Sequence, residues 1–236
     1  MAKPLALIVG VGDGLSASVA RLFAHEGYDL ILSARSTDKL TALGNETSAK
    51  LIAGEASDPA SVQSLFEEIA APLRVVVYNP SARVRGPLID LEPEAVRNAI
   101  EVTAYGAFLV GQQAAVKMLD QEPDEAGKRG TILFTGASAG VKGFPQSAPF
   151  AMGKFAQRGL SESMARELHP QGIHVAWVNI DGGIRNASRP ERVDAADNPD
   201  SMLDPDEIAK TYLHLINQHR SVWSNEVAVR PWVERF

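Results

Sequence analysis

The sequence predicts an α/β fold: a doubly wound parallel sheet of seven strands in a three-layer α/β/α arrangement, forming one domain over residues 1–236. Short, continuously apolar segments recur along the chain and alternate with longer stretches whose apolar residues repeat at helical spacing. A strand that is apolar on both sides must be buried on both faces, which is typical of parallel sheets covered by helices. The length of 236 residues is sufficient for one such sheet and its core.

The first half of the chain contains four predicted strands, which are apolar and bounded by polar or glycine-containing turns: Leu5–Val9, Asp29–Ser33, Lys50–Ala53 and Arg74–Tyr78. Two helices are predicted from apolar residues at helical spacing: Leu15–His25 and Thr37–Glu46. A third helix begins at Asp58-Pro59, where Asp is a favourable N-cap and Pro fits the first helical position.

The second half continues the alternation. A long helix begins at Glu92-Pro93 and runs to Leu119, and another covers Phe150–His169. A last helix begins at Asp204-Pro205, and three further strands are predicted: Gly130–Thr135, Ile173–Ile180 and Val227–Val229. The stretches 121–129 and 186–200 are polar and are predicted to be loops. The second follows the sixth strand at the carboxyl edge, where doubly wound sheets bind ligands, so residues 183–203 are interpreted as a substrate lid; a mobile surface loop is the alternative.

Composition excludes several classes of function. The formal net charge of −6 argues against nucleic acid as the main partner, because phosphate binding needs a basic surface. The absence of cysteine removes disulfides, thiolate metal sites and cysteine nucleophiles, and the five histidines form no recognisable ligand pattern, so no metal is expected. No segment is long enough for a signal sequence or a membrane helix, which predicts a cytoplasmic protein without a membrane partner.

A glycine-rich turn, Gly10-Val-Gly12-Asp-Gly14, joins the first strand to the first helix. Glycines let the backbone approach a pyrophosphate, and a helix N-terminus offers unpaired N–H groups. The fit to known patterns is imperfect, because Leu15 and Ser16 stand where stricter patterns have glycine, and Asp13 places a negative charge near the expected phosphates. A tight turn without a ligand is the alternative.

The end of the second strand indicates which dinucleotide is bound. A carboxylate there would contact a ribose 2′-hydroxyl, but the strand ends in Ala34-Arg35. A guanidinium pairs bidentately with phosphate oxygens, so Arg35 favours NADP(H) over NAD(H). The alternative is an ordinary surface arginine.

These features together resemble the short-chain dehydrogenase/reductase family along essentially the whole chain. The matching segments are Gly10 to Gly14 with Ala34-Arg35, then Tyr78-Asn79-Pro80-Ser81, Phe150-Ala-Met-Gly-Lys154 and Asp181-Gly182-Gly183-Ile184. The resemblance implies a Rossmann sheet of order 3-2-1-4-5-6-7, a nicotinamide cofactor, a small-molecule substrate and a homodimer or homotetramer. The expected cofactor-binding residues are Gly10, Gly12, Asp13, Gly14, Leu15, Ala34, Arg35, Glu55, Ala56, Asn79, Pro80, Ser81, Lys154, Asp181, Gly182 and Ile184.

The catalytic positions implied by the resemblance are altered. Phe150 stands at the family's tyrosine position and has no proton to donate, and Thr103 stands at the asparagine position. The serine position falls on Ala137, one residue before Ser138, which a local shift of the loop would bring in. Only Lys154 matches, and the resemblance assigns it to the nicotinamide ribose as well as to catalysis. Loss of a general acid costs on the order of 10²- to 10⁴-fold in rate.

Two readings of function follow. The first is an NADP(H)-dependent oxidoreductase that acts on a small carbonyl or alcohol with an altered proton donor. The second is a catalytically inactive NADP(H)-binding homologue with a regulatory or structural role. Asp181 is a possible donor if its pKa is raised, although a loop-capping role fits it as well. Arg83 and Arg85 are placed to meet an anionic substrate or to be solvated charges.

Overall fold

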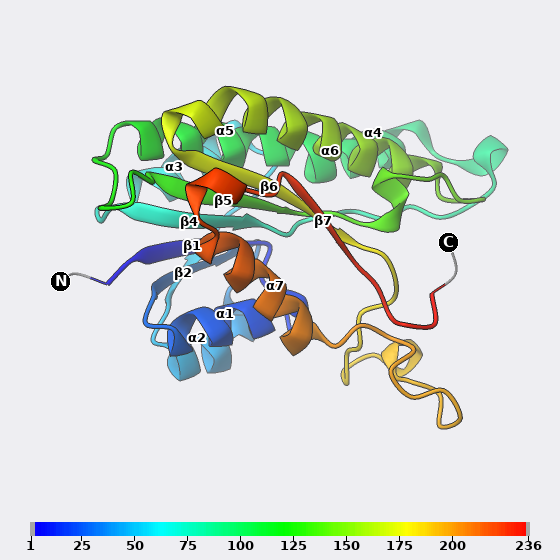
Figure 1. The fold of residues 1–236 in the computed structure, drawn as a ribbon. Coiled ribbons are helices and arrows are strands. Elements are labelled where there is room, and N and C mark those ends of the chain that lie inside the picture. The colour runs from blue at the N-terminus through cyan, green and yellow to red at the C-terminus, as the bar shows by residue number, and fades with distance from the viewer. Residues whose placement is uncertain (1–2, 235–236) are drawn as a thin grey trace.

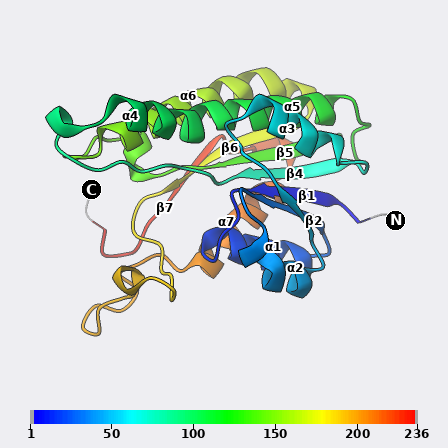
Figure 2. The ribbon, with the colours of Figure 1, turned by 180° about the vertical axis from the view of Figure 1, so that it is seen from behind.

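The computed structural model describes residues 3–234 and contains a seven-stranded parallel sheet of order β3-β2-β1-β4-β5-β6-β7. The predicted fold class and strand order are confirmed. Helices α3, α4, α5 and α6 cover one face of the sheet, and α1, α2 and α7 cover the other (Figures 1 and 2). The strands are β1 Leu5–Val9, β2 Asp29–Ala34, β3 Lys50–Ala53, β4 Leu73–Tyr78, β5 Gly130–Thr135, β6 Ile173–Ile180 and β7 Glu226–Val229. The helices are α1 Leu15–His25, α2 Thr41–Thr47, α3 Pro59–Glu67, α4 Pro93–Ile100, α5 Gly106–Leu119, α6 Ala148–Leu168 and α7 Pro205–Asn217.

Alternation along each strand divides the apolar core into two layers. In β1, Leu5, Leu7 and Val9 pack under α3, α5 and α6, whereas Ala6 and Ile8 pack under α1, α2 and α7. Successive side chains of a strand point to opposite faces, so a continuously apolar strand supplies both layers. This explains why the buried strands lack the polar alternation of a half-exposed sheet.

The long helix expected over 93–119 is continuous but contains one irregular turn. Between α4 and α5 the chain forms a π-helical turn, η3, over Glu101–Tyr105. Such turns are rare and concentrate at functional sites. In this turn the Val102 carbonyl accepts a hydrogen bond from the buried Tyr78 hydroxyl at 2.5 Å. The Thr103 side chain of the same turn is fully buried.

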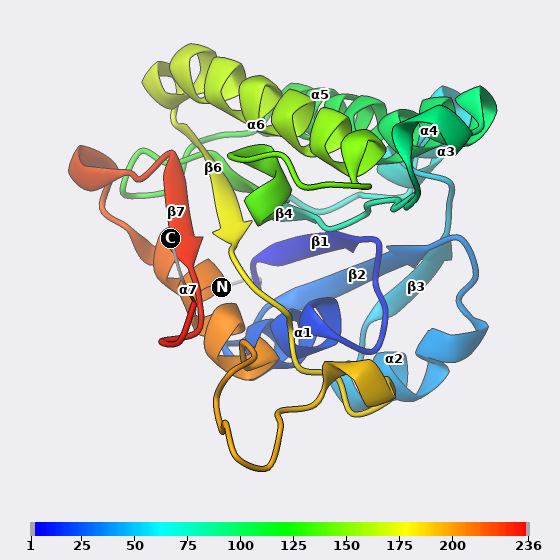
Figure 3. The ribbon, with the colours of Figure 1, turned by 90° about the vertical axis from the view of Figure 1, so that its right-hand side faces the viewer.

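The expected lid leaves the carboxyl end of β6 and returns at α7. It lies on the α1 side of the sheet (Figures 1 and 3). The segment is not without structure: Ile184 forms a parallel bridge with Leu203, and a short 3-10 turn, η6, covers Pro190–Arg192. It therefore returns to the sheet at its base and carries a compact turn in its first half.

Candidate functional site

The ends of three strands meet at one edge of the sheet. Val9, the last residue of β1, pairs with Ser33 of β2 and with Tyr78 of β4. The loops that follow therefore leave side by side, and the Asn79 side-chain amide donates to the Gly10 carbonyl at 3.0 Å. This is the edge where doubly wound sheets bind ligands, and most of the predicted site residues lie along it.

Gly10 is required by the local backbone. Its φ is +80°, a left-handed conformation that residues with a side chain rarely adopt. A Cβ at this position would lie 2.6 Å from Cγ of Pro80, which is closer than real contacts allow. The N–H groups of Gly10 and Val11 both donate to the Ser33 carbonyl. The turn is thus tight, and Pro80 forms its wall.

The rest of the loop leaves backbone exposed. A Cβ on Gly12 would meet no atom of the described residues within 4 Å. Helix α1 follows Gly14 without a side-chain cap on its first turn, where N–H groups lack helical partners. The departures from stricter glycine patterns have structural roles: Leu15 is buried in the core, and the Ser16 hydroxyl accepts the Gly12 N–H at 2.9 Å. An open backbone beside a helix N-terminus is suited to phosphate.

Asp13 faces the 183–203 segment. The Asn186 side-chain amide lies 3.4 Å from Asp13 Oδ1. A hydrogen bond from Ser188 and the contact with Asn186 hold the pKa of Asp13 below its usual value, and the charge of Arg189 adds to the effect. The negative charge of Asp13, which argued against phosphate binding, is therefore stabilised by residues of the 183–203 segment.

The residues after β2 and β3 surround the outer end of this edge. Arg35 is exposed, and its guanidinium has no ion-pair partner between residues 3 and 234; Ala34 before it is half-buried. Glu55 is half-buried and accepts the Ser57 hydroxyl at 2.9 Å, while Ala56 is buried beside α5. Arg35 is therefore free to take an anion at the end of β2.

Lys154 is buried at the start of α6, with 2% of its surface exposed. Its ammonium donates to the Thr135 carbonyl at 2.5 Å and to Gln157 Oε1 at 3.1 Å, and Gln157 in turn donates to the Thr103 carbonyl at 3.1 Å. Burial, together with repulsion from Arg83, lowers the pKa of Lys154 to about 7. An amine with this pKa exchanges a proton near neutrality, as a general acid or base must.

Phe150 lies one helical turn before Lys154 and is buried. It forms a small buried cluster with Ala137 and Ala139, and the Arg83 guanidinium lies 4.2 Å from the centre of its ring. Ser138 is half-buried and begins a 3-10 turn, η4. It is thus Ala137, the residue at the predicted serine position, that shares the cluster with Phe150.

Thr103 is enclosed within the π-helical turn η3. Its side chain is fully buried, and its hydroxyl oxygen accepts the Ala82 N–H at 3.1 Å. A Cβ on Gly153 of α6 would lie 2.8 Å from Thr103 Cβ, so the two helices touch here. The carbonyl oxygen of Thr103 accepts a hydrogen bond from the Gln157 side-chain amide, which links Thr103 to Lys154.

The segment after β6 is held by the C-terminal strand. The Asp181 carboxylate faces Arg230 at 3.5 Å, and the Asp181 N–H donates to the Val229 carbonyl. A Cβ on Gly182 would lie 2.8 Å from Pro231. Asp181 is therefore engaged by a cation, which fits the loop-capping reading better than a free acid.

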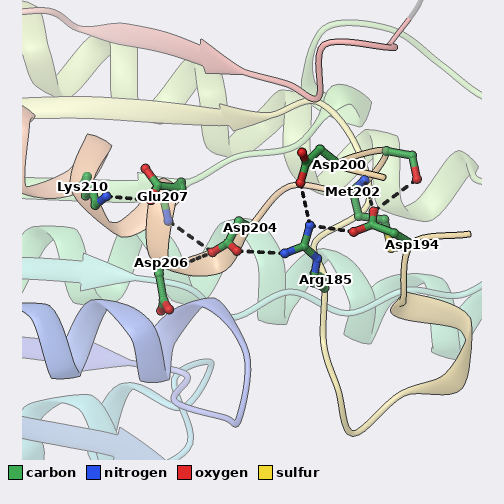
Figure 4. Close-up of polar contacts among 9 residues, drawn as sticks. Arg185, Asp194, Asp200, Met202, Asp204, Asp206, Glu207 and Lys210 are labelled. Atoms are coloured by element: carbon green, nitrogen blue, oxygen red, sulfur yellow. Dashed lines mark hydrogen bonds and ion pairs between the residues drawn. The ribbon is translucent and has the colours of Figure 1, made fainter. Parts of the chain in front are cut away.

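The 183–203 segment is braced from inside by Arg185. Its guanidinium pairs with Asp194 at 2.6 Å, Asp200 at 3.2 Å and Asp204 at 2.9 Å (Figure 4). Asp204 also caps α7 by accepting the Glu207 and Asp206 N–H groups. The base of the segment is thereby tied to a helix, while Asn186 in its first half reaches Asp13 of the glycine loop.

Two of the four tyrosines, Tyr78 and Tyr212, have hydroxyl groups that are engaged elsewhere in the chain. Tyr78 is buried against η3, and Tyr212 is buried with its hydroxyl 2.8 Å from Thr135 Oγ1. Burial raises the pKa of both phenols above the usual value, away from neutrality. Tyr105 lies on η3 with 44% of its surface exposed, and Tyr28 ends the loop before β2.

The sequence model of the short chain dehydrogenase family matches residues 4–192. The chain belongs to the short-chain dehydrogenase family. It is 24% identical over 235 residues to an uncharacterized oxidoreductase of Staphylococcus aureus, with 96% of each chain covered. A solved short-chain dehydrogenase from Rhodopseudomonas palustris is 28% identical, covers 98% of this chain and 100% of its own, and superposes with a TM-score of 0.82. A metagenomic short-chain oxidoreductase solved with NADP shares the fold at a TM-score of 0.81 and 24% identity, over 98% of both chains.

Sequence reasoning about this short-chain dehydrogenase missed one residue at the centre of the site. Gln157 links Lys154 to the Thr103 carbonyl, and its Oε1 also lies 3.3 Å from Trp177 Nε1. A signal was present: Phe150, Lys154 and Gln157 stand at positions i, i+4 and i+7 of one helix and so share a face.

Within residues 3–234, no helix combines the length and apolar character needed to cross a bilayer. The same residues contain no group of three or more His, Asp or Glu side chains placed to hold a metal ion.

Proposed function

We propose that this short-chain dehydrogenase homologue binds NADP(H) and uses it to interconvert a small carbonyl compound and its alcohol. The observation that carries the proposal is the convergence of the glycine loop, Arg35 and buried Lys154 on one edge of the sheet. The bound dinucleotide would supply or accept the hydride. The complexes of BdcA with NADPH and of the metagenomic enzyme with NADP are consistent with this cofactor.

Each part of the edge suits a different part of the dinucleotide. The open backbone at Gly12 and the start of α1 would take the diphosphate, and Arg35 the 2′-phosphate. Lys154, which contacts the end of β5, would lie at the nicotinamide end, with Asn79 and Asp181 at the ends of the flanking strands β4 and β6. Asn79 holds the Gly10 carbonyl, so it acts here by shaping the loop.

The function is tested by titrating the protein with NADPH, followed by a panel of aldehydes and ketones. We expect micromolar or tighter NADPH binding and slow NADPH oxidation with at least one carbonyl compound. Tight binding without turnover across the panel would favour the inactive reading. Absence of NADPH binding would contradict both.

Arg35→Ser is expected to weaken NADPH binding by about 10- to 100-fold, because it removes a charge-assisted contact worth about 1.5–3 kcal/mol. NADH affinity should change by less than about twofold, since NADH has no 2′-phosphate. Fluorescence titration with both nucleotides measures the two effects. Arg21→Ser is the matched control, because Arg21 lies on α1 and pairs with Glu46 at 2.8 Å. Equal loss for NADPH and NADH would contradict a 2′-phosphate role.

We further propose that Lys154 replaces the missing phenol as proton donor. With Phe150 at the position that the resemblance assigns to tyrosine, Lys154 is a buried titratable group close to it, four residues along the same helix. Two of the three ammonium hydrogens are taken by Thr135 and Gln157, and the third has no acceptor within residues 3–234. In carbonyl reduction the hydride would go to carbon and this third proton to oxygen, leaving a neutral amine.

The second candidate function, an NADP(H)-binding protein without catalysis, is favoured by a separate observation. Phe150 packs against Ala137 and Ala139, so the place of the family's hydroxyl groups is apolar. In that case the Lys154–Gln157 pair would serve cofactor binding and helix packing alone.

The 183–203 segment is proposed to act as the substrate lid. Its first half contacts Asp13 of the glycine loop, and its base is braced by Arg185. Closure of such a segment excludes water from the reacting atoms.

A homodimer or homotetramer is proposed from the outer face of α5 and α6, which carries exposed apolar side chains: Phe108, Val116, Met152 and Phe155. Light scattering after gel filtration is expected to give twice or four times the chain mass. Phe155→Glu should shift the protein towards the monomer, whereas Val222→Glu, at an exposed apolar site on the turn before β7, should not. A monomeric wild-type protein at micromolar concentration would contradict the proposal.

A further inference from the structure

Arg83 lies against the Phe150 ring, and the charges of three further arginines, from the same loop and from the 183–203 segment, act on it. Arg83 and Arg85 follow β4, and Arg189 and Arg192 lie in the first half of the 183–203 segment. Partial burial, together with repulsion from Arg192, Arg85 and Arg189, lowers the pKa of Arg83. The fold therefore brings their positive charges close enough to act on one another.

In the described part of the chain, these cations are not neutralised by carboxylates. No ion pair joins any of the four to an acidic side chain within residues 3–234, whereas Arg185, a few residues away, pairs with three aspartates. The charge of Arg189 contributes to the lowered pKa of Asp13, but Asp13 accepts its hydrogen bonds from Ser188 and Asn186 and not from Arg189. The chain as a whole carries a formal net charge of −6, so this group of arginines is a positively charged region on an acidic protein. Grouped cations without counter-charges raise the local concentration of anions.

The cluster also has an orientation. Arg83 is fixed with its guanidinium 4.2 Å from the centre of the Phe150 ring, and its charge depresses the pKa of Lys154. Arg192 reaches the end of β6, where its Nη1 lies 3.1 Å from the position of a Cβ on Gly183. Arg83 and Arg192 thus border the Lys154 end of the edge, and Arg189 borders the glycine loop.

We propose that Arg83, with Arg192, binds a carboxylate or phosphate group of the substrate, so that the carbonyl compounds this site accepts are anionic. A guanidinium that lies over an aromatic ring can still offer its fork of N–H donors to such a group bidentately. The inference rests on the proposed function in assuming that substrate enters beside Lys154. The diphosphate of the cofactor is the other possible source of an anion, and it is assigned to the glycine loop.

The test compares benzoate with benzamide, which have nearly the same shape and differ in charge. Calorimetric titrations are made with and without saturating NADP⁺, in wild-type protein and in Arg83→Gln. We expect benzoate to bind about tenfold more tightly than benzamide, and the ratio to fall towards one in Arg83→Gln. Arg21→Gln, a surface variant on α1, should keep the wild-type ratio. NADPH affinity of Arg83→Gln should stay within about twofold of wild type.

Equal affinity for benzoate and benzamide, or no saturable binding of either, would overturn the inference. A loss of NADPH affinity in Arg83→Gln as large as the loss for benzoate would assign the cluster to the cofactor and overturn it as well. Failure of the proposed function has a different signature. Benzoate would still be preferred over benzamide, but no carbonyl compound would be reduced.

Discussion

Lys154→Met is expected to lower kcat/KM for carbonyl reduction by on the order of 10²- to 10⁴-fold, the usual contribution of a general acid. Methionine keeps the length and volume of the side chain but removes the proton. NADPH titration and thermal melting of the variant separate loss of chemistry from loss of cofactor or fold. Lys210→Met is the control, because Lys210 is an exposed partner of Glu207 on α7. Unchanged turnover in Lys154→Met would exclude this lysine as the donor.

The pH profile of the wild-type protein tests the same role without a substitution. Reduction needs the ammonium form, so its rate should fall as pH rises through about 7, the pKa of Lys154. Alcohol oxidation needs the neutral amine, so its rate should rise through the same range. A lysine with a purely structural role would produce neither the fall in the reduction rate nor the rise in the oxidation rate. Gln157→Leu removes a hydrogen-bond acceptor of the Lys154 ammonium, which should lower the pKa of Lys154 further. Both pH-dependent changes in rate should therefore move to lower pH.

The double variant Phe150→Tyr/Ala137→Ser is expected to raise the rate of carbonyl reduction by about 10²-fold or more, because it restores two hydroxyl groups beside Lys154. The neighbouring ammonium would lower the pKa of the new phenol and make it a better acid. Single-turnover measurements with NADPH report the change directly. Ala139→Ser, in the same apolar cluster, controls for the effect of adding a hydroxyl without the expected geometry.

If the double variant binds NADPH normally but gains no activity, the position of residue 150 relative to the substrate differs from that in the rest of the family. That result would contradict the assignment of Phe150 to the tyrosine position. A gain from Phe150→Tyr alone would show that the phenol matters more than the serine hydroxyl.

Much of the fold was predictable because its signals are local. Five consecutive apolar residues at Leu5–Val9 indicate a buried strand, and Asp-Pro pairs mark helix starts at Pro59 and Pro205 as the structure has them. The long helix after Glu92 is present, but its π-helical turn was not predictable because it has a tertiary cause. The π-helical turn at Glu101–Tyr105 coincides with contacts from Tyr78 and Gln157, which are distant in sequence.

The sequence by itself determined the residue types of the site: glycines that permit a tight turn at Gly10, a cation at Arg35, a lysine at position 154 and a phenylalanine where an acid was expected. Only the tertiary structure decided what these residues contact. Gln157 contacts the Thr103 carbonyl, Asp13 contacts the 183–203 segment, and Arg83 lies over the Phe150 ring. The physical reason is that charge interaction and burial depend on distance in space. From the sequence, Lys154 is a lysine on an amphipathic helix with nothing to indicate an unusual pKa. In the folded chain the π-helical turn and the end of β5 bury it, and this burial lowers its pKa.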